Sequence, residues 1–289
     1  MAFRNVIIDS RCKLEYSLNY LICKKQDEEK RIVLDEIRTI VITSTQVAIT
    51  SSLICMLSKK KIKVIFCDYE HNPECELTPF SNNFYTYRKI KEQMEFIKNN
   101  KYLWKRIIEE KINNQAYNLK FAGLIDSYNL LMQYKNDVLE NDISNREGHS
   151  AKVYFNSLFG VEFSRRSKDD INKYLNYGYA ILVSTINREL KALGYLTEFG
   201  IHHIGESNSF NFSYDLIEPI RPLVDLYVIK KIVNDDNFKS EFVKMLTLEV
   251  IYNNRKVILD NAIHLYVNDM ILYLKTSNED YIKFINYEL

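Results

Sequence analysis

The sequence predicts an α+β protein in which a small β-rich N-terminal domain precedes a larger all-α C-terminal domain. Three observations predict this division. The first eighty residues contain no glycine and consist of short β-branched runs. From about residue 87 onward, apolar residues recur at helical spacing. Pro73 and Pro79 lie between the two textures, so the junction is expected between about residues 70 and 85, with domains at 1–80 and 81–289.

The N-terminal domain is expected to be a sheet or sandwich with one helix. Its strands are predicted from runs of about five residues that are separated by charged breaks, namely NVIID, YLICKK, RIVLDEI, TIVITS and VIFCD. The helix is predicted in TSSLICMLSKKK, where Leu53, Ile54 and Leu57 share one face. The lysines at its end suit the negative end of the helix dipole.

Long helices are predicted in the C-terminal domain, first in the segment 87–120. The clearest helix begins at Asp169 and Asp170 and ends at Gly194. A glycine-containing loop follows and carries two histidines. Proline disfavours helix in the residue before it and suits the first turn of a new helix, so Pro219 and Pro222 predict a break there.

The composition excludes several classes of protein. A hydrophobic content of 46% is too high for a disordered chain, and no run of about eighteen uncharged apolar residues could cross a membrane. Charge appears too early for a signal peptide, so a cytoplasmic protein is expected. The five cysteines form no CxxC pair and suggest neither disulfides nor zinc. With 39 basic and 38 acidic residues, any nucleic-acid site must depend on local positive charge.

Candidate chemistry lies near the ends of predicted elements. Glu147 stands at a helix start, His202 and His203 lie in the loop, and Asp215 and Glu218 are three residues apart. Such a set of oxygen and nitrogen donors suits Mn²⁺ or Mg²⁺. An ion of this kind can hold a phosphoryl oxygen and acidify an attacking hydroxyl.

Each of these residues also has a purely structural alternative. Ser144 and Glu147 have the spacing of a capping box, and a single histidine is more often structural than a ligand. Glu218 could compensate a helix dipole. The residue pattern alone leaves these alternatives open.

Three stretches together resemble the CRISPR-associated integrase family, the first Cas protein family, in the form found in type II-A systems. They are NREGHSAKVYFNSLFG, NYGYAILVSTINREL and GIHHIGESNSFNFSYDLIEPIRPLVD. The resemblance covers nearly the whole chain. It implies a metal-dependent DNA endonuclease and integrase that inserts foreign DNA fragments into a CRISPR array by transesterification. It also implies Mg²⁺ or Mn²⁺ as cofactor and a location in the bacterial cytoplasm.

The resemblance also implies partners and site residues. Homodimers would be bridged by the small second Cas protein, with the N-terminal domain making dimer and partner contacts and the C-terminal domain carrying catalysis. Glu147, His203 and Glu218 match the family's metal ligands and catalytic residues, and Asp215 matches a supporting acid. His202 remains a second candidate for the histidine ligand.

Double-stranded DNA, both the captured fragment and the CRISPR repeat, is expected to bind through clustered cations. The candidates are Arg165, Arg166 and Lys168 in SRRSK, and Lys59, Lys60, Lys61 and Lys63 in KKKIK. A solvated surface is the alternative for both clusters and is favoured for the second. Arg146 and Arg221 flank the proposed ligands and could hold either a phosphate or the carboxylates.

Two rival functions remain open on the sequence. A nuclease for branched DNA in repair would use the same ligands and the same metal. A non-catalytic helical DNA-binding scaffold would use Glu147 as a helix cap and the histidines as structural residues. No glycine-rich phosphate loop occurs, which agrees with phosphodiester exchange because that reaction needs no external energy source.

Overall fold

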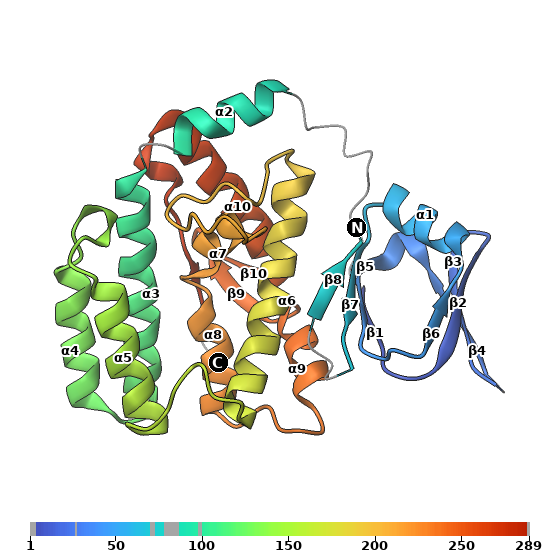
Figure 1. Cartoon of the computed structure of the whole chain (residues 1–289), viewed down its shortest axis with the longest axis horizontal. Helices are drawn as coiled ribbons and strands as arrows, with labels where there is room; N and C mark the ends of the chain where they lie inside the picture. The colour runs from blue at the N-terminus through green and yellow to red at the C-terminus, as the bar shows by residue number, and fades with distance from the viewer. Residues whose placement is uncertain (1–3, 27, 70–72, 78–86, 98–99, 288–289) are drawn as a thin grey trace. The chain divides into compact units, whose positions relative to one another are not determined.

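The computed structural model describes residues 4–26, 28–69, 73–77, 87–97 and 100–287. The chain divides into two compact units, residues 1–82 and 83–289, which are described separately (Figure 1). The predicted order, with β-rich structure before helical structure, is confirmed.

The N-terminal unit contains two four-stranded sheets. The first has the order β1-β5-β7-β8 and the second the order β4-β3-β2-β6. Strands β1, β5 and β7 are parallel, whereas β8 joins them antiparallel. The strands of the first sheet are β1 (Arg4–Ile8), β5 (Ile37–Ile42), β7 (Lys63–Cys67) and β8 (Pro73–Glu76), and those of the second are β2 (Cys12–Ser17), β3 (Tyr20–Lys24), β4 (Glu29–Val33) and β6 (Val47–Ile49).

One helix, α1 (Ser51–Lys59), packs into the core of this unit, and a single turn of 3-10 helix, η1 (Leu34–Glu36), precedes β5. The Thr50 side chain accepts a hydrogen bond from the N–H of Leu53, which satisfies a donor at the start of α1. Leu14, Ile40 and Leu53 from the two sheets and the helix share one buried cluster. The predicted helix and four of the five predicted strands are present. The fifth, RIVLDEI, is divided, because β4 ends at Val33, the turn η1 follows, and Ile37 begins β5. Strands β2, β6 and β8 were not predicted.

The C-terminal unit is mainly helical, and α3, α4 and α5 lie side by side at the left of Figure 1 and pack against one another. The helices are α2 (Tyr87–Ile97), α3 (Lys101–Phe121), α4 (Ile125–Asn136), α5 (Arg146–Phe159), α6 (Asp170–Ala192), α7 (Asn211–Ile217), α8 (Arg221–Ile229), α9 (Phe238–Met245) and α10 (Leu259–Thr276), with 3-10 turns η2 (Glu140–Asp142) and η3 (Glu279–Tyr281). Asp169 caps α6 by accepting a hydrogen bond from the N–H of Asn172, as its sequence position predicts.

A short three-stranded sheet in this unit departs from the all-α prediction. Its strands are β9 (Glu249–Tyr252), β10 (Arg255–Ile258) and β11 (Ile285–Asn286), in the order β10-β9-β11. Asn253 and Asn254 join β9 to β10, and both have positive φ, at 49° and 59°. Two left-handed residues in succession form the tight turn that a two-residue hairpin requires, and asparagine tolerates this conformation.

Among the described helices, none has the length and apolar character that crossing a membrane requires.

Candidate active site

Helix α3 presents a row of buried polar side chains to the segment that joins α7 to α8. Asn114 donates a hydrogen bond to the carbonyl of Pro219 at 2.9 Å, and Asn118 donates to the carbonyl of Pro222 at 2.7 Å. Both asparagines are buried, so these hydrogen bonds satisfy polar groups that would otherwise be costly in the interior. The row therefore fixes the position of Glu218, which lies at the end of α7.

Lys111, on the same row, brings two predicted site residues together. Its Nζ lies 2.7 Å from Glu147 Oε1 and 2.5 Å from Glu218 Oε2. The lysine side chain is 10% exposed and that of Glu218 only 4%. Two carboxylates that are far apart in the sequence therefore meet at one ammonium group.

The charges at this cluster favour the ionised forms. Burial by itself would raise the pKa of Glu218, but the positive charges of Arg221 and Lys111 outweigh it and lower that pKa. Burial would lower the pKa of Lys111, but the negative charges of Glu218 and Glu147 raise it. Lys111 was not predicted from the sequence. Its signal was a lysine in line with Asn114 and Asn118 on a helix face that is otherwise apolar.

Glu147 lies at the start of α5 but does not form the capping box. Ser144 Oγ instead donates to the carbonyl of Asp137 at 3.3 Å. The carboxylate of Asp142 accepts from the N–H groups of Arg146 and Glu147 at 2.8 and 2.9 Å, so Asp142 supplies the helix cap. The side chain of Glu147 is thereby left to contact Lys111.

Asp215 organises the histidine loop. Its carboxylate, fully buried on α7, accepts hydrogen bonds from the N–H groups of Ile201, His202 and His203, the last two at 3.0 and 3.1 Å. The loop passes so close that a Cβ on Gly200 would lie 2.7 Å from Asp215 Oδ2 and 2.3 Å from the carbonyl oxygen of His203. Only glycine fits this approach.

His203 faces the acidic cluster. Its Nδ1 lies 2.5 Å from Asp215 Oδ1, and this hydrogen bond raises the pKa of His203. The negative charges of Glu218 and Glu147 raise the same pKa further, although burial opposes them. Because Nδ1 is engaged, Nε2 is the nitrogen that a metal would use.

His202 points to different neighbours. Its Nδ1 lies 3.4 Å from Asn141 Oδ1 in the η2 turn. Of the two histidines, His203 therefore lies with Asp215 and within electrostatic reach of both glutamates.

The donor chemistry of this cluster suits a hard divalent cation, but its arrangement is that of an ion-pair cluster. Within the described ranges, no three His, Cys, Asp or Glu side chains gather in the way a metal site requires. Lys111 occupies the position between the two glutamates. Glu218 Oε2 is buried and paired with the Lys111 ammonium group, so a metal ion would have to replace that group to reach this oxygen.

A cavity of about 250 Å³ opens beside the cluster. Glu147, Glu218 and Lys111 line it together with two arginines, and the full lining is Lys111, Gln115, Glu147, Ala151, Phe155, Arg165, Tyr179, Glu218, Arg221 and Asp225. Three cations and three acids thus face one small polar space.

The predicted DNA-binding arginines divide between this cavity and the surface. Arg221 Nε lies 2.9 Å from Glu218 Oε1, and Arg165 donates to Asn176 at 2.7 Å. Arg146 pairs with Asp137 at 3.2 Å, away from the cavity lining. Arg166 and Lys168 are exposed.

The second predicted cation cluster, in the N-terminal unit, is largely engaged. Lys60 pairs with Asp35 at 2.5 Å, and Lys63 is buried against Glu76. These contacts agree with the structural alternative for this cluster.

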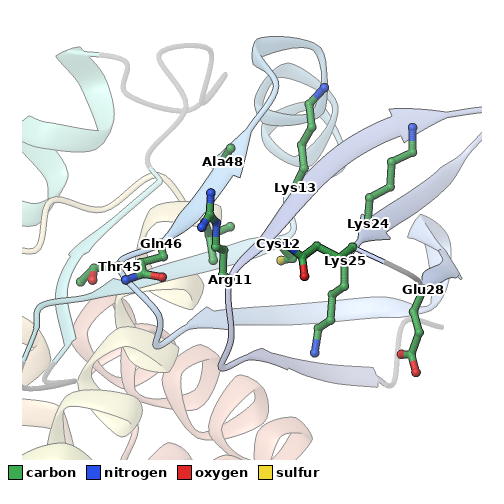
Figure 2. A pocket seen from close by; sticks show the side chains of 11 residues that line it. Arg11, Cys12, Lys13, Lys24, Lys25, Glu28, Thr45, Gln46 and Ala48 are labelled. Carbon is green, nitrogen blue, oxygen red and sulfur yellow. The ribbon is translucent and has the colours of Figure 1, made fainter.

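The N-terminal unit also contains a groove whose walls carry several cations (Figure 2). It encloses about 1150 Å³ between β2, β3 and β6, and the cations on its walls are Arg11, Lys13, Lys24 and Lys25. Lys13 and Lys24 share one acid, because Glu15 lies 2.5 and 2.6 Å from their Nζ atoms. This groove was not predicted from the sequence.

Comparison with solved structures places the fold among proteins of DNA integration and CRISPR systems. A casposase bound to an integration product matches with a TM-score of 0.76 and 20% identity, covering 96% of this chain and 92% of that one. A CAS1 protein from Thermotoga maritima matches with a TM-score of 0.75 and 19% identity, over 94% and 97% of the two chains. At these identities the likeness concerns the fold.

The family follows from the sequence. The model of the family described as CRISPR associated protein Cas1 matches residues 6–258. The CRISPR-associated endonuclease Cas1 of Neisseria meningitidis serogroup C is 32% identical over 230 residues, which are 79% of this chain and 76% of the relative. A relative from Francisella tularensis subsp. novicida is 27% identical over 275 residues, covering 84% and 86%. The chain belongs to the Cas1 family, so the predicted family is confirmed, and the type II-A form stays a prediction.

Proposed function

We propose that this protein is a metal-dependent DNA endonuclease and integrase that inserts foreign DNA fragments into a CRISPR array. Membership of the Cas1 family supports a nuclease that acts in CRISPR systems. The observation that carries the proposal is the meeting of Glu147 and Glu218 at Lys111, beside His203 and a polar cavity. The expected site of action is the bacterial cytoplasm, where the array lies.

The proposed reaction is a transesterification. The 3′-hydroxyl oxygen of the incoming fragment forms a new bond to a phosphorus atom at the repeat boundary. The bond from that phosphorus to the leaving strand breaks, and the leaving strand keeps a 3′-hydroxyl. One phosphodiester replaces another, so the exchange needs no nucleotide cofactor.

Glu147, His203 and Glu218 would hold the Mg²⁺ or Mn²⁺ ion, with Asp215 as a supporting acid. The ion would supply positive charge for the oxygens of the reacting phosphate. Asp215 orients the His203 ring through its Nδ1 and fixes the loop backbone, so that Nε2 is the nitrogen presented. Lys111 supplies one positive charge between the two carboxylates and keeps them together when no ion is bound.

DNA would be held by cations outside the ligand set. Arg165 and Arg221 line the cavity and are candidates for contacts to the reacting phosphate. Arg146, together with the exposed Arg166 and Lys168, would contact phosphates farther along the duplex.

The proposed partners are a second copy of the chain and the small second Cas protein, which would bridge two dimers. Solved structures described as Cas6-RT-Cas1–Cas2 complexes share this fold, the first with a TM-score of 0.74 over 96% of this chain. The N-terminal unit would make the dimer and partner contacts.

The test mixes the protein and its small partner with Mn²⁺, duplexes that bear 3′-hydroxyl ends, and a plasmid that carries the repeat. Joined products are expected. Nicked plasmid without joining would favour the rival nuclease for branched DNA.

The scaffold alternative is tested by His203→Ala. The enzyme proposal expects a folded protein without strand transfer. A scaffold would instead show altered stability and unchanged DNA processing.

A further inference from the structure

We propose that Tyr179 and Asp225 are positioning residues that hold Arg165 and Arg221 as one binding site for a phosphodiester group. The site lies in the cavity of about 250 Å³, which all four residues line. The anion is identified as DNA phosphate on the basis of the proposed function, whereas the anion site itself is argued from the contacts below.

Both arginines contact the ring of one tyrosine. Arg221 Cζ lies 4.8 Å from the centroid of the Tyr179 ring, and Arg165 Cζ lies 5.4 Å from it. Tyr179 stands on α6 and is only 7% exposed, so its ring is fixed by packing. A guanidinium at this distance is attracted by the ring electrons. The Tyr179 ring therefore holds the guanidinium groups of Arg165 and Arg221 near each other, although their like charges repel.

Asp225 fixes the tyrosine. The Tyr179 hydroxyl donates a hydrogen bond to Asp225 Oδ1 on α8, and both groups are buried. A buried hydrogen bond to a carboxylate is short and strongly directional, so the ring cannot turn away from the arginines. Asp225 thus acts on the arginines through Tyr179.

The two guanidinium groups reach the cavity from different elements. Arg165 lies in the connection between α5 and α6, and it donates hydrogen bonds to Asn172 and Asn176 on α6. Arg221 begins α8. Its Nε forms an ion pair with Glu218 Oε1 at 2.9 Å, and its guanidinium lines the cavity beside that carboxylate.

A phosphodiester suits this pair of arginines. It offers two non-bridging oxygens, and guanidinium groups bind such oxygens through paired N–H donors. Negative charge on these oxygens grows when phosphorus changes partners, so donors that are already in place stabilise that state without reorganising. Tyr179 and Asp225, by fixing the arginines in advance, would therefore help to stabilise the reacting phosphate.

The test measures binding of inorganic phosphate by calorimetry in the presence of EDTA, so that no metal contributes. Tyr179→Leu is expected to raise the dissociation constant about fivefold, as loss of the cation–π contacts implies. Arg221→Met is expected to do the same. The double variant should be worse than either single variant by less than the product of the two effects, because Tyr179 acts partly through Arg221 and partly through Arg165.

Tyr177→Leu is the matched control. Tyr177 lies on the same helix, is fully buried, and packs its ring 5.3 Å from that of Phe238. This variant should lose stability and keep the phosphate dissociation constant of the wild type. If Tyr179→Leu does not fold, Tyr179→Phe and Asp225→Leu replace it, because each removes the hydrogen bond between the Tyr179 hydroxyl and Asp225 and keeps a side chain of similar size.

Three results would overturn the proposal. They are a wild-type protein that binds no phosphate in EDTA, a Tyr179 variant with an unchanged constant, and effects of Tyr179 and Arg221 that multiply. Strand transfer with Mn²⁺ is measured on the same samples. If the Tyr179 variant binds phosphate more weakly but the wild type shows no strand transfer, the integrase proposal alone is refuted. If the wild type shows strand transfer but the Tyr179 variant binds phosphate as the wild type does, the positioning proposal alone is refuted.

Discussion

The indole ring of Trp104 lies parallel to the imidazole ring of His202, with centroids 4.2 Å apart and planes 3° apart. Trp104 is completely buried on α3, so this stacking holds His202 against the helix. His203 meets the same indole edge-on, with centroids 5.7 Å apart, and has its Nδ1 on Asp215. Adjacent histidines therefore have different surroundings, one stacked on an aromatic ring and one paired with an acid.

This difference predicts opposite results for two substitutions. His202→Phe keeps a flat ring on Trp104 and should retain strand transfer within about threefold of the wild type, because volume-conserving changes are tolerated. His203→Phe removes the nitrogen donor and should lower activity by about 100-fold or more. Joined-product yield at fixed Mn²⁺ checks both variants, with circular dichroism to verify folding. Equal losses in the two variants would contradict the assignment of His203.

Much of this site could be expected from the sequence, because motifs place Glu147, His203, Asp215 and Glu218 near element ends. The helix cap formed by Asp142 could not be predicted. Asn141, Asp142 and Asn145 have positive φ, and no simple residue spacing indicates such a turn. Lys111 was missed because a lysine within a long helix normally faces solvent. Its role becomes visible only when α5 and α7 pack against α3.

In the fold, too, some elements could be predicted from the sequence and others could not. The helix at α1 and the start of α6 carry local signals, namely a capping threonine and a capping aspartate, and both were found. The strand β2 has the sequence CKLEYS, whose apolar and charged residues alternate as in a half-buried strand; this signal was overlooked because the prediction relied on continuous β-branched runs. The strand β9 was missed because it has four residues and depends on the Asn253–Asn254 turn.

Stability should fall in acid because of Glu189. Burial would raise the pKa of Glu189, but hydrogen bonds from His264 and Arg188 outweigh it and lower that pKa to about 2, from an ordinary value of 4.5. A lowered pKa stabilises the folded state above about pH 4.5, and this stabilisation is lost as the pH falls toward about 2. The expected loss is up to about 3 kcal/mol.

Urea unfolding of the wild type and Glu189→Gln between pH 6 and pH 3 checks this expectation. The variant should show a smaller dependence of the unfolding free energy on pH, because it cannot bind the proton. Parallel curves for the two proteins would show that other carboxylates account for the acid sensitivity.

DNA binding should depend on the exposed cations between α5 and α6. Arg166 and Lys168 are exposed, and neither forms an ion pair among the described residues. Removing one phosphate contact reduces the slope of log K against log salt by about 0.9, so the double alanine variant should reduce it by about 2. Lys244→Ala is the control, because Lys244 is similarly exposed but pairs with Glu241 at 2.7 Å. Fluorescence anisotropy over a salt series measures the slopes, and equal slopes for both variants would place the DNA elsewhere.

Lys111 provides a test of the metal site that does not depend on catalysis. Lys111→Met leaves Glu147 and Glu218 close together without their shared cation, and loss of one partner from a buried ion pair costs about 3–5 kcal/mol. Mn²⁺ would supply the missing positive charge between the same two carboxylates. The variant should therefore have a lower melting temperature than the wild type without metal, and should gain more than the wild type when Mn²⁺ is added.

A second variant separates this effect from nonspecific binding of the ion. Lys111→Met combined with Glu218→Gln removes one of the two carboxylates, so the extra stabilisation by Mn²⁺ should disappear. Lys60→Met, which breaks an exposed pair with Asp35, should respond to Mn²⁺ as the wild type does. Differential scanning calorimetry with and without Mn²⁺ provides the comparison. If Mn²⁺ raised the melting temperature of all four proteins equally, Glu147 and Glu218 would not hold the ion, and Lys111 would be a structural counter-ion only.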